Sequence, residues 1–599
     1  MGFLPISYAD MKERGWEELD FVLITGDAYV DHPSFGAAVI SRFLESRGYR
    51  IGIIAQPRWD TVHDFTRMGK PRLAVLITAG NIDSMVNHYT AAKRWRRDDV
   101  YSPGGRAKLR PDRATIVYSH RVREAFGDIP IILGGLEASL RRMSHYDYWD
   151  NAIRPSLLVD SGADLIVYGM GEHQIIEVAE ALEGGLPIRD IIYINGTVFP
   201  TSDLSRAYQP ILLPQYQEMV SSREKFAQSF LVQYQNTDAR NGKTLVEPYD
   251  DRYVVQNPPA LPLSRDEMDQ IYSLPYMRTY HPRYEKEGGV PAIKEVRFSI
   301  VTHRGCFGGC NFCSLSFHQG RVVQSRSHSS VINEAEQLIR EPDFKGYIHD
   351  VGGPTANFLH PACKMQLTRG ACKTKQCLFP SPCRHLFIDH SDFLSLLRTL
   401  RKLPGVKKVF VRSGIRYDYL LYDNNEEFFE EFCRYHISGQ LKVAPEHVSE
   451  KVLKMMGKSP RELYDRFVKK YFEMNQHLGL KQYLVPYLIS SHPGSDLSAA
   501  IQLAEYVRDM DFNPEQVQDF YPTPGTFSTC MYYTGLDPRT MEKVYIPGTP
   551  HEKAMQRALI QYRDPQNYDL VHEALIQAGR RDLIGTGKKC LIRPRKKTG

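Results

Sequence analysis

The stretch RFSIVTHRGCFGGCNFCSLS, residues 297–316, holds three cysteines in a glycine-rich loop that follows an apolar, strand-like run. The cysteines, spaced C-x3-C-x2-C, are Cys306, Cys310 and Cys313. Thiolates are soft ligands that suit iron–sulfur clusters, and glycines let a backbone wrap closely around one. Three thiolates leave one iron of a four-iron cluster without a protein ligand, so the loop predicts a cluster with one open iron.

A structural zinc site is the alternative that the spacing alone leaves open. Zinc takes four ligands, and His303 or His318 could complete the set. The position of the loop argues against zinc, because active sites gather at the carboxyl ends of strands in a β/α domain.

Strand-like and helical runs alternate around the loop, which predicts parallel strands over 291–535. The expected strands cover 295–302, 346–351, 408–412, 440–444 and 483–489. The first 195 residues show the same alternation. Their expected strands, 21–25, 51–55, 73–78, 129–133 and 165–168, are short and apolar on both faces, and three of them run into glycines. This pattern predicts an α/β, doubly wound, Rossmann-like domain over 1–195.

Two further segments complete the expected domain organisation. Residues 196–290 are rich in Pro, Tyr and charge, so we expect a connector with little core of its own. Residues 536–599 contain two helical patterns and end in a basic tail, which predicts a short, mostly helical C-terminal region.

The cysteine loop resembles that of the radical S-adenosylmethionine (radical SAM) superfamily, including the aromatic Phe312 before the last cysteine. The resemblance implies a [4Fe–4S] cluster whose open iron binds S-adenosyl-L-methionine (SAM), a 5′-deoxyadenosyl radical as the reactive product, and a partial (β/α)6 barrel. It also implies cofactor contacts at the ends of later strands: Gly352, Gly353, Arg412, Ser413 and Glu446. Pro354 stands where the superfamily usually has a glutamate, and no catalytic residue beyond the cluster ligands is indicated.

Nearly the whole chain resembles the YgiQ family of radical SAM proteins. The matching motifs are GGLEASLRR at 134–142, YGMGE at 168–172, DVGGPTAN at 350–357 and VAPEH at 443–447. The resemblance implies an enzyme reduced by a protein such as flavodoxin or ferredoxin, and it implies no particular substrate.

A second cysteine group lies in a predicted insertion over 360–388. Its members, spaced C-x8-C-x4-C-x5-C, are Cys363, Cys372, Cys377 and Cys383. Four thiolates can hold zinc or a second iron–sulfur cluster, and the spacing does not choose between the two metals. Exposed free thiols oxidise readily, so we expect a bound metal.

The N-terminal domain resembles the domain that binds cobalamin in some radical SAM enzymes. The Asp-x-His-x-x-Gly signature of that domain is missing, since the nearest text is DHPSFG at 31–36. We therefore expect no cobalamin, and a cobalamin-dependent radical SAM methyltransferase stands as the alternative.

Composition excludes several classes of protein. The formal net charge of +6 is small for 599 residues, and no apolar run approaches the length of a membrane helix, so we expect a cytoplasmic protein with no membrane partner. Residues 93–113 are basic, and a zinc-stabilised nucleic-acid-binding protein is therefore the second reading of the chain. Acidic residues are mixed into this stretch, which favours a solvated loop.

Overall fold

The N-terminal half is built on one mixed β-sheet. The computed structural model describes residues 2–511, 513–514 and 517–595. Five parallel strands lie in the order β3-β1-β4-β5-β8. Their bounds are Phe21–Thr25 (β1), Ile51–Ala55 (β3), Ala74–Thr78 (β4), Ile131–Leu133 (β5) and Leu165–Val167 (β8). The order of successive strands reverses between β1 and β4, which makes this point the topological switch of the sheet. In doubly wound domains, ligands usually bind there, beyond the carboxyl ends of the strands.

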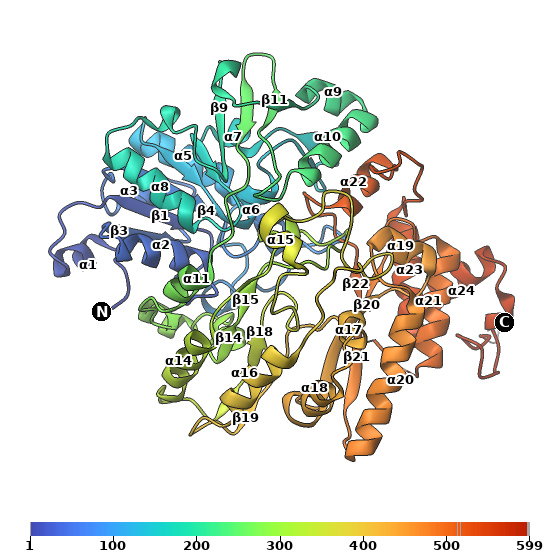
Figure 1. Cartoon of the computed structure of the whole chain (residues 1–599). Helices are drawn as coiled ribbons and strands as arrows, with labels where there is room; N and C mark the ends of the chain where they lie inside the picture. Colours follow the sequence, from blue (N-terminus) through green and yellow to red (C-terminus); the bar gives the residue numbers. More distant parts are fainter. Residues whose placement is uncertain (1, 512, 515–516, 596–599) are drawn as a thin grey trace.

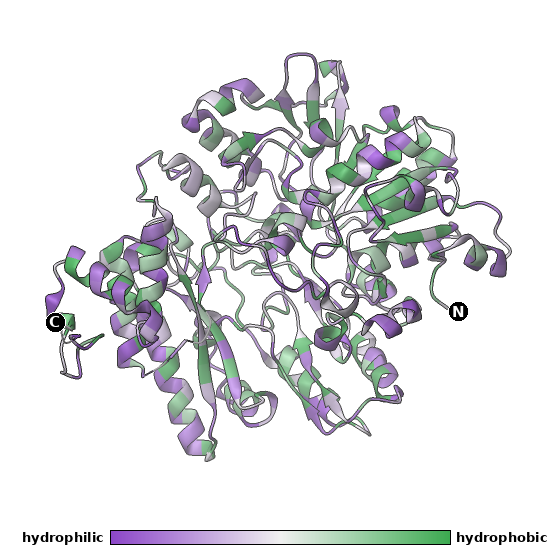
Figure 2. Ribbon diagram, turned by 180° about the vertical axis from the view of Figure 1, so that it is seen from behind, coloured by the Kyte–Doolittle hydropathy of each residue, from purple (hydrophilic) through white to green (hydrophobic). Residues whose placement is uncertain are grey.

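Helices cover both faces of this sheet (Figure 1). One face packs against α2 (Gly36–Ser46), α8 (Glu172–Glu183) and α11 (Arg265–Tyr272), and the other against α5 (Ala114–Phe126) and α7 (Leu157–Ser161). Alternate strand residues serve the two cores, because successive side chains of a strand point to opposite faces. The strands are therefore apolar on both sides, as the green ribbons of Figure 2 show.

The expected connector over 196–290 differs from the prediction, because it extends the sheet. Four strands add to the edge at β8 in the order β9-β12-β11-β10. They are β9 (Thr197–Thr201), β10 (Ile211–Leu212), β11 (Leu245–Pro248) and β12 (Tyr253–Gln256). Their side chains join the same two cores, so this segment shares the hydrophobic core of the first 195 residues.

The second half is a partial barrel of parallel strands. Hydrogen-bonded pairs join β14 to β18, β17 to β19, β20 to β21 and β21 to β22. An isolated parallel bridge between Ile415 and Val443 connects the segment after β19 to β20. The strands are β14 (Ser299–Val301), β17 (Tyr347–Ile348), β18 (Asp350–Gly352), β19 (Lys408–Val409), β20 (Gln440–Glu446), β21 (Tyr483–Ser490) and β22 (Gln518–Asp519). The predicted fold class is confirmed, although α12 (Ile293–Val296) occupies the start of the first expected strand.

Amphipathic helices separate these strands and cover the barrel. They are α14 (His328–Ile339), α16 (Ser391–Arg401), α20 (Arg461–Leu478) and α21 (Leu497–Asp509). The C-terminal helices α23 (Pro550–Ile560) and α24 (Tyr568–Gln577) pack into the same core, as do Leu591 and Ile592 of the basic tail. The described part of the tail is therefore anchored. No helix within the described ranges has both the length and the apolarity needed to cross a bilayer.

A buried ion pair and a stacked cation join the two halves. Arg304, just before the cysteine loop, pairs with Glu172 at the start of α8, and both side chains are almost fully buried. The guanidinium of Arg142 lies 3.9 Å from the ring centre of Phe317 in α13 (Leu315–His318). Removing either partner of a buried ion pair is costly, so these contacts fix the cysteine loop against the N-terminal sheet.

Candidate active site

The cysteine loop follows the first barrel strand and depends on its glycines. Gly305 has a φ of +84°, and an added Cβ there would lie 2.4 Å from the carbonyl oxygen of Val322. At Gly308 a Cβ would lie 3.3 Å from the Cys306 sulfur and 2.8 Å from a nitrogen of Arg416. The loop can therefore bring its backbone this close to the thiols only because side chains are missing at these positions.

The three predicted ligands, Cys306, Cys310 and Cys313, lie close enough for their charges to act on one another. Burial raises the pKa of the Cys306 thiol, and the charge of Cys310 adds to this rise. Cys313 is partly open to solvent, yet desolvation by the crowded loop, followed by the charges of Cys310 and Cys306, also raises its pKa. Three cysteines in one loop supply the soft sulfur ligands that iron prefers, so the donor set fits an iron–sulfur cluster.

Arg416 lies beneath the cysteines, and the sequence did not single it out. Its Nη1 donates to the sulfur of Cys310 at 3.4 Å, and its Nε donates to Asp418 at 2.9 Å. Burial disfavours the Asp418 carboxylate, but the charge and hydrogen bonds of Arg416 outweigh it and hold the pKa of Asp418 at about 2. A fully ionic pair therefore supports the Cys310 side of the loop.

The neighbourhood of Cys306 removes one candidate fourth ligand. Thr355 Oγ1 lies 3.5 Å from the Cys306 sulfur. The ring nitrogens of His303 are 2.8 Å from Thr302 Oγ1 and 3.0 Å from the Thr355 carbonyl oxygen, and burial lowers the pKa of His303 to about 4. His303 is thus a neutral side chain with both nitrogens engaged. Among the residues that the structure describes, no three Cys, His, Asp or Glu side chains stand close enough to hold a single metal ion.

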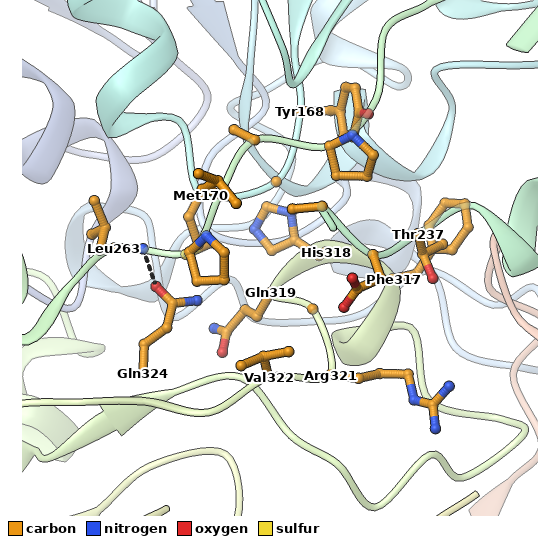
Figure 3. Close-up of a pocket in the computed structure, with 18 of the residues that line it drawn as sticks. Tyr168, Met170, Thr237, Leu263, Phe317, His318, Gln319, Arg321, Val322 and Gln324 are labelled. Carbon is orange, nitrogen blue, oxygen red and sulfur yellow. Dashed lines mark hydrogen bonds between the residues drawn. The ribbon is translucent and has the colours of Figure 1, made fainter. Parts of the chain in front are cut away.

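His318, the other candidate, lies in a narrow cavity between α13 and the N-terminal domain. Figure 3 shows it with Tyr168 and Met170 above it and with Gln319 and Gln324 below it. Gln324 Oε1 accepts a hydrogen bond of 2.9 Å from the backbone of Leu263. Burial lowers the pKa of His318 to about 4, so this histidine is a neutral side chain at the contact between the two domains.

The end of the second barrel strand lies beside the residues that flank the cysteine loop. An added Cβ at Gly353 would lie 2.7 Å from the ring of His303, and one at Gly352 would lie 3.1 Å from Ser413. Ser413 is held by Asp350, which accepts its backbone N–H at 3.0 Å and also its hydroxyl. The Arg412 side chain is exposed, and its charge acts on His349.

Glu446 and Phe312 have different surroundings. Glu446 ends β20 at an irregularity in the strand pairing, with a φ of +67°, a strained value for a residue with a Cβ. Burial raises the pKa of Glu446, and its charge acts on Cys313. Phe312 packs against the ring of His492 and the small apolar cluster around Val452. Glu446 therefore borders the cysteines, whereas Phe312 anchors the loop to the barrel.

A large cavity lies beyond the carboxyl ends of the N-terminal strands. Its volume is about 580 Å³, and it reaches from the sheet to Ser314 and Gly353 beside the cysteine loop. Apolar side chains from four strands and one helix contribute to its lining: Leu23, Leu76, Ile132, Val167 and Ile175. The expectation that the domain binds no cobalamin is not supported, since a missing histidine signature does not exclude a ligand from a cavity of this size.

The other predicted groups can be placed as well. The cysteines of the second group lie together, because the charges of Cys363, Cys372 and Cys383 each act on Cys377. In the basic stretch over 93–113, Arg110 is buried between two carboxylates at 2.8 Å. Such internal pairs account for part of the basic charge of this stretch.

Family models match three consecutive parts of the chain. The model "Radical SAM N-terminal" matches residues 3–299, and "Radical SAM superfamily" matches residues 300–505. A domain of unknown function, DUF3362, matches residues 515–599. The second match contains all seven clustered cysteines.

Relatives and solved structures extend these matches over the whole chain. A UPF0313 protein of Clostridium botulinum is 59% identical over 592 residues, covering 99% of this chain and 93% of the relative. Another from Clostridium perfringens is 57% identical and covers 100% and 90%. The structure of the radical SAM methyltransferase TsrM from Kitasatospora setae, with cobalamin and a [4Fe–4S] cluster bound, matches at 13% identity with a TM-score of 0.49, covering 93% and 99%. The structure of the cobalamin-dependent radical enzyme OxsB matches at 10% identity with a TM-score of 0.49, covering 95% and 76%. With its radical SAM domain and full-length similarity to these relatives, the chain belongs to the UPF0313 family.

Proposed function

We propose that Cys306, Cys310 and Cys313 hold a [4Fe–4S] cluster and that the enzyme cleaves SAM reductively on it, as a YgiQ-type radical SAM protein. One observation carries the proposal: three cysteines spaced C-x3-C-x2-C share one glycine-dependent loop, and the neighbouring His303 has both nitrogens engaged. With cluster and SAM bound, one electron cleaves the sulfonium into methionine and a 5′-deoxyadenosyl radical. The substrate that the radical attacks is not identified.

The side chains around the loop take distinct parts in this proposal. Arg416 stabilises the thiolate of Cys310 through a charge-assisted hydrogen bond, and Asp418 fixes the guanidinium in place. Glu446, buried beside Cys313, offers a carboxylate to the hydroxyl or amino groups of SAM. Backbone groups of Gly352 and Gly353 supply contacts where Pro354 lacks a carboxylate.

The remaining parts of the proposal concern partners and location. An electron donor such as flavodoxin or ferredoxin would reduce the cluster, because none of the side chains described is a low-potential reductant. A reducing cytoplasm suits a chain with 10 cysteines, since thiols stay reduced there. Nucleic acid remains a candidate partner through the exposed side chains of Arg94, Arg96 and Arg97.

Product analysis tests the proposal. Protein purified without oxygen is incubated with SAM and dithionite, and 5′-deoxyadenosine and methionine are quantified by mass spectrometry. We expect both products from the wild type and neither from Cys310→Ala, while Cys590→Ser, a change outside both cysteine groups, keeps the activity. Equal product formation by wild type and Cys310→Ala would rule the proposal out.

A second candidate function is a cobalamin-dependent radical SAM methyltransferase. The observation that favours it is the 580 Å³ cavity, whose apolar floor lies at the switch point of the sheet and whose mouth opens beside Ser314. The apolar side chains Leu23, Leu76 and Ile132 would hold the nonpolar part of a corrinoid, which would supply a methyl group for transfer.

Titration with hydroxocobalamin tests this candidate. We expect saturable binding, followed by the visible spectrum of the corrinoid, that is lost when Ala37→Trp fills the cavity lining. The matched control is Ala92→Trp, at an exposed position away from the cavity. Absence of binding, or equal binding by both variants, argues that the cavity holds another ligand.

A further inference from the structure

The four cysteines of the insertion form one group at the surface of the catalytic loop. Cys363 immediately precedes α15 (Lys364–Arg369), and the backbone N–H of Cys383 donates to the Cys377 carbonyl at 2.9 Å. All four are free thiols, and burial, together with the charges of the other three, raises the pKa of Cys377 to about 11. Residues up to 20 positions apart in the chain thus bring four soft ligands into one neighbourhood.

The second cysteine group contacts the loop that carries Cys306, Cys310 and Cys313. Gln376, next to Cys377, donates through its side chain to the Gly309 carbonyl at 2.5 Å and to Asn311 Oδ1 at 2.9 Å. A small apolar cluster unites both regions, since Cys306 and Cys377 pack against the same residues. Within it the rings of Phe307 and Phe358 stack with centres 3.7 Å apart.

Arg321 supplies a buried positive charge to the group. Its two terminal nitrogens donate to the carbonyl oxygens of Cys372 and Lys375 at 2.7 and 2.8 Å, and its charge lowers the pKa of Cys377. The side chain is 7% exposed, and its buried Nε has no hydrogen-bond partner among the described residues. A buried donor without a partner costs stability, and a sulfide or thiolate beside it would satisfy it.

The spacing of the sulfurs bears on the choice of metal. Four thiolates around one zinc ion lie about 3.8 Å apart, since the Zn–S distance is about 2.3 Å in a tetrahedral site. No three such side chains in the described ranges are drawn together closely enough for one ion. The ligands of a cubane lie farther apart, because the cluster itself separates them. The arrangement therefore favours an iron–sulfur cluster over zinc.

We propose that Cys363, Cys372, Cys377 and Cys383 hold a second [4Fe–4S] cluster, directly against the catalytic loop. With four thiolates, each iron has a protein ligand, so this cluster offers no open site to SAM. Arg321 offsets part of its negative charge, and the cluster fastens the insertion to the loop through Gln376. This site is separate from the proposed SAM site and does not depend on it.

Metal analysis of three proteins tests the proposal. Iron, zinc and acid-labile sulfide are measured per chain after anaerobic reconstitution of the wild type, of Cys306→Ala/Cys310→Ala/Cys313→Ala, and of Cys590→Ser as control. We expect about eight irons in the wild type and the control and about four in the triple variant, with sulfide in equal amounts and little zinc. Should the triple variant fail to fold, the stoichiometry of the wild type still decides between four and eight.

The outcomes separate this inference from the proposed function. About four irons in the wild type, lost in the triple variant, would overturn the second cluster and leave the SAM site standing. About four irons in both the wild type and the triple variant would support the second cluster and refute the SAM site. One zinc per chain in the triple variant, with no iron, would show that the insertion is a zinc site.

Discussion

Replacing Arg416 with methionine should destabilise the fold and disturb the cluster together. The change keeps a long side chain but removes the charge that neutralises Asp418, which is 1% exposed. Breaking a buried pair by removing one partner costs about 3–5 kcal/mol, because the remaining charge stays buried and unpaired. The Cys310 sulfur also loses the hydrogen bond that Arg416 Nη1 donates to it at 3.4 Å.

The pKa of Asp418 gives an independent magnitude. Its folded value of about 2 lies below the ordinary value of 3.8, a depression worth about 2 kcal/mol in favour of the folded state. A depressed carboxylate contributes its stability above its unfolded pKa and loses it as the pH falls through the folded value. The wild type should therefore lose this contribution between about pH 4 and pH 2, and Arg416→Met should lack it throughout.

Denaturant unfolding of anaerobic protein measures both free energies: the cost of Arg416→Met at neutral pH, and the loss of the Asp418 contribution in the wild type at acidic pH. The double variant Arg416→Met/Asp418→Leu removes the stranded charge, so it should recover most of the lost stability while its SAM cleavage stays impaired. An unfolding free energy of Arg416→Met equal to that of the wild type would refute the buried-pair argument. Wild-type cleavage by the double variant would show that Arg416 has no role beside Cys310.

Three further substitutions follow from the same geometry. Gly308→Ala should lose iron from the first cluster, because its methyl group would stand 3.3 Å from a ligand sulfur. The control Gly36→Ala, where no atom lies within 4 Å of the added carbon and φ is not positive, should keep it, and iron analysis distinguishes the two variants. Glu446→Gln should change the unfolding free energy by no more than about 1 kcal/mol but weaken SAM binding about tenfold, measured by equilibrium dialysis. Arg304→Met should lower the unfolding free energy by about 3–5 kcal/mol, since Glu172 remains buried without its partner. Calorimetric unfolding measures this change, and a variant as stable as the wild type would contradict the prediction.

Local patterns were enough to predict the fold class and several element bounds. The strands Phe21–Thr25 and Ile51–Ala55 were predicted correctly, because short runs that are apolar on both faces occur in buried parallel sheets. The sequence of residues 196–290 predicts only a connector, because the strands there are short and pair with distant segments. Pairing between β9 and β8 or β12 depends on tertiary contacts that periodicity does not report.

The site was predictable where spacing carries the chemistry and not where the fold brings distant residues together. The cysteine motif and the glycines were visible in the sequence, whereas Arg416 lies 106 residues from its partner Cys310. Its signal was present as an arginine and an aspartate two residues apart after the third strand, in RYD at 416–418. The position at the end of the expected strand 408–412 instead indicates Arg412 as a cofactor contact. In the structure this strand ends at Val409, and the Arg412 side chain is exposed.

The most direct test of the open iron is electron paramagnetic resonance of the reduced protein with and without SAM. If one iron lacks a thiolate, SAM must bind it, so the signal of the first cluster should change when SAM is added and should be absent from the triple variant Cys306→Ala/Cys310→Ala/Cys313→Ala. A reduced wild-type spectrum that contains the first cluster and stays the same at saturating SAM would contradict the account.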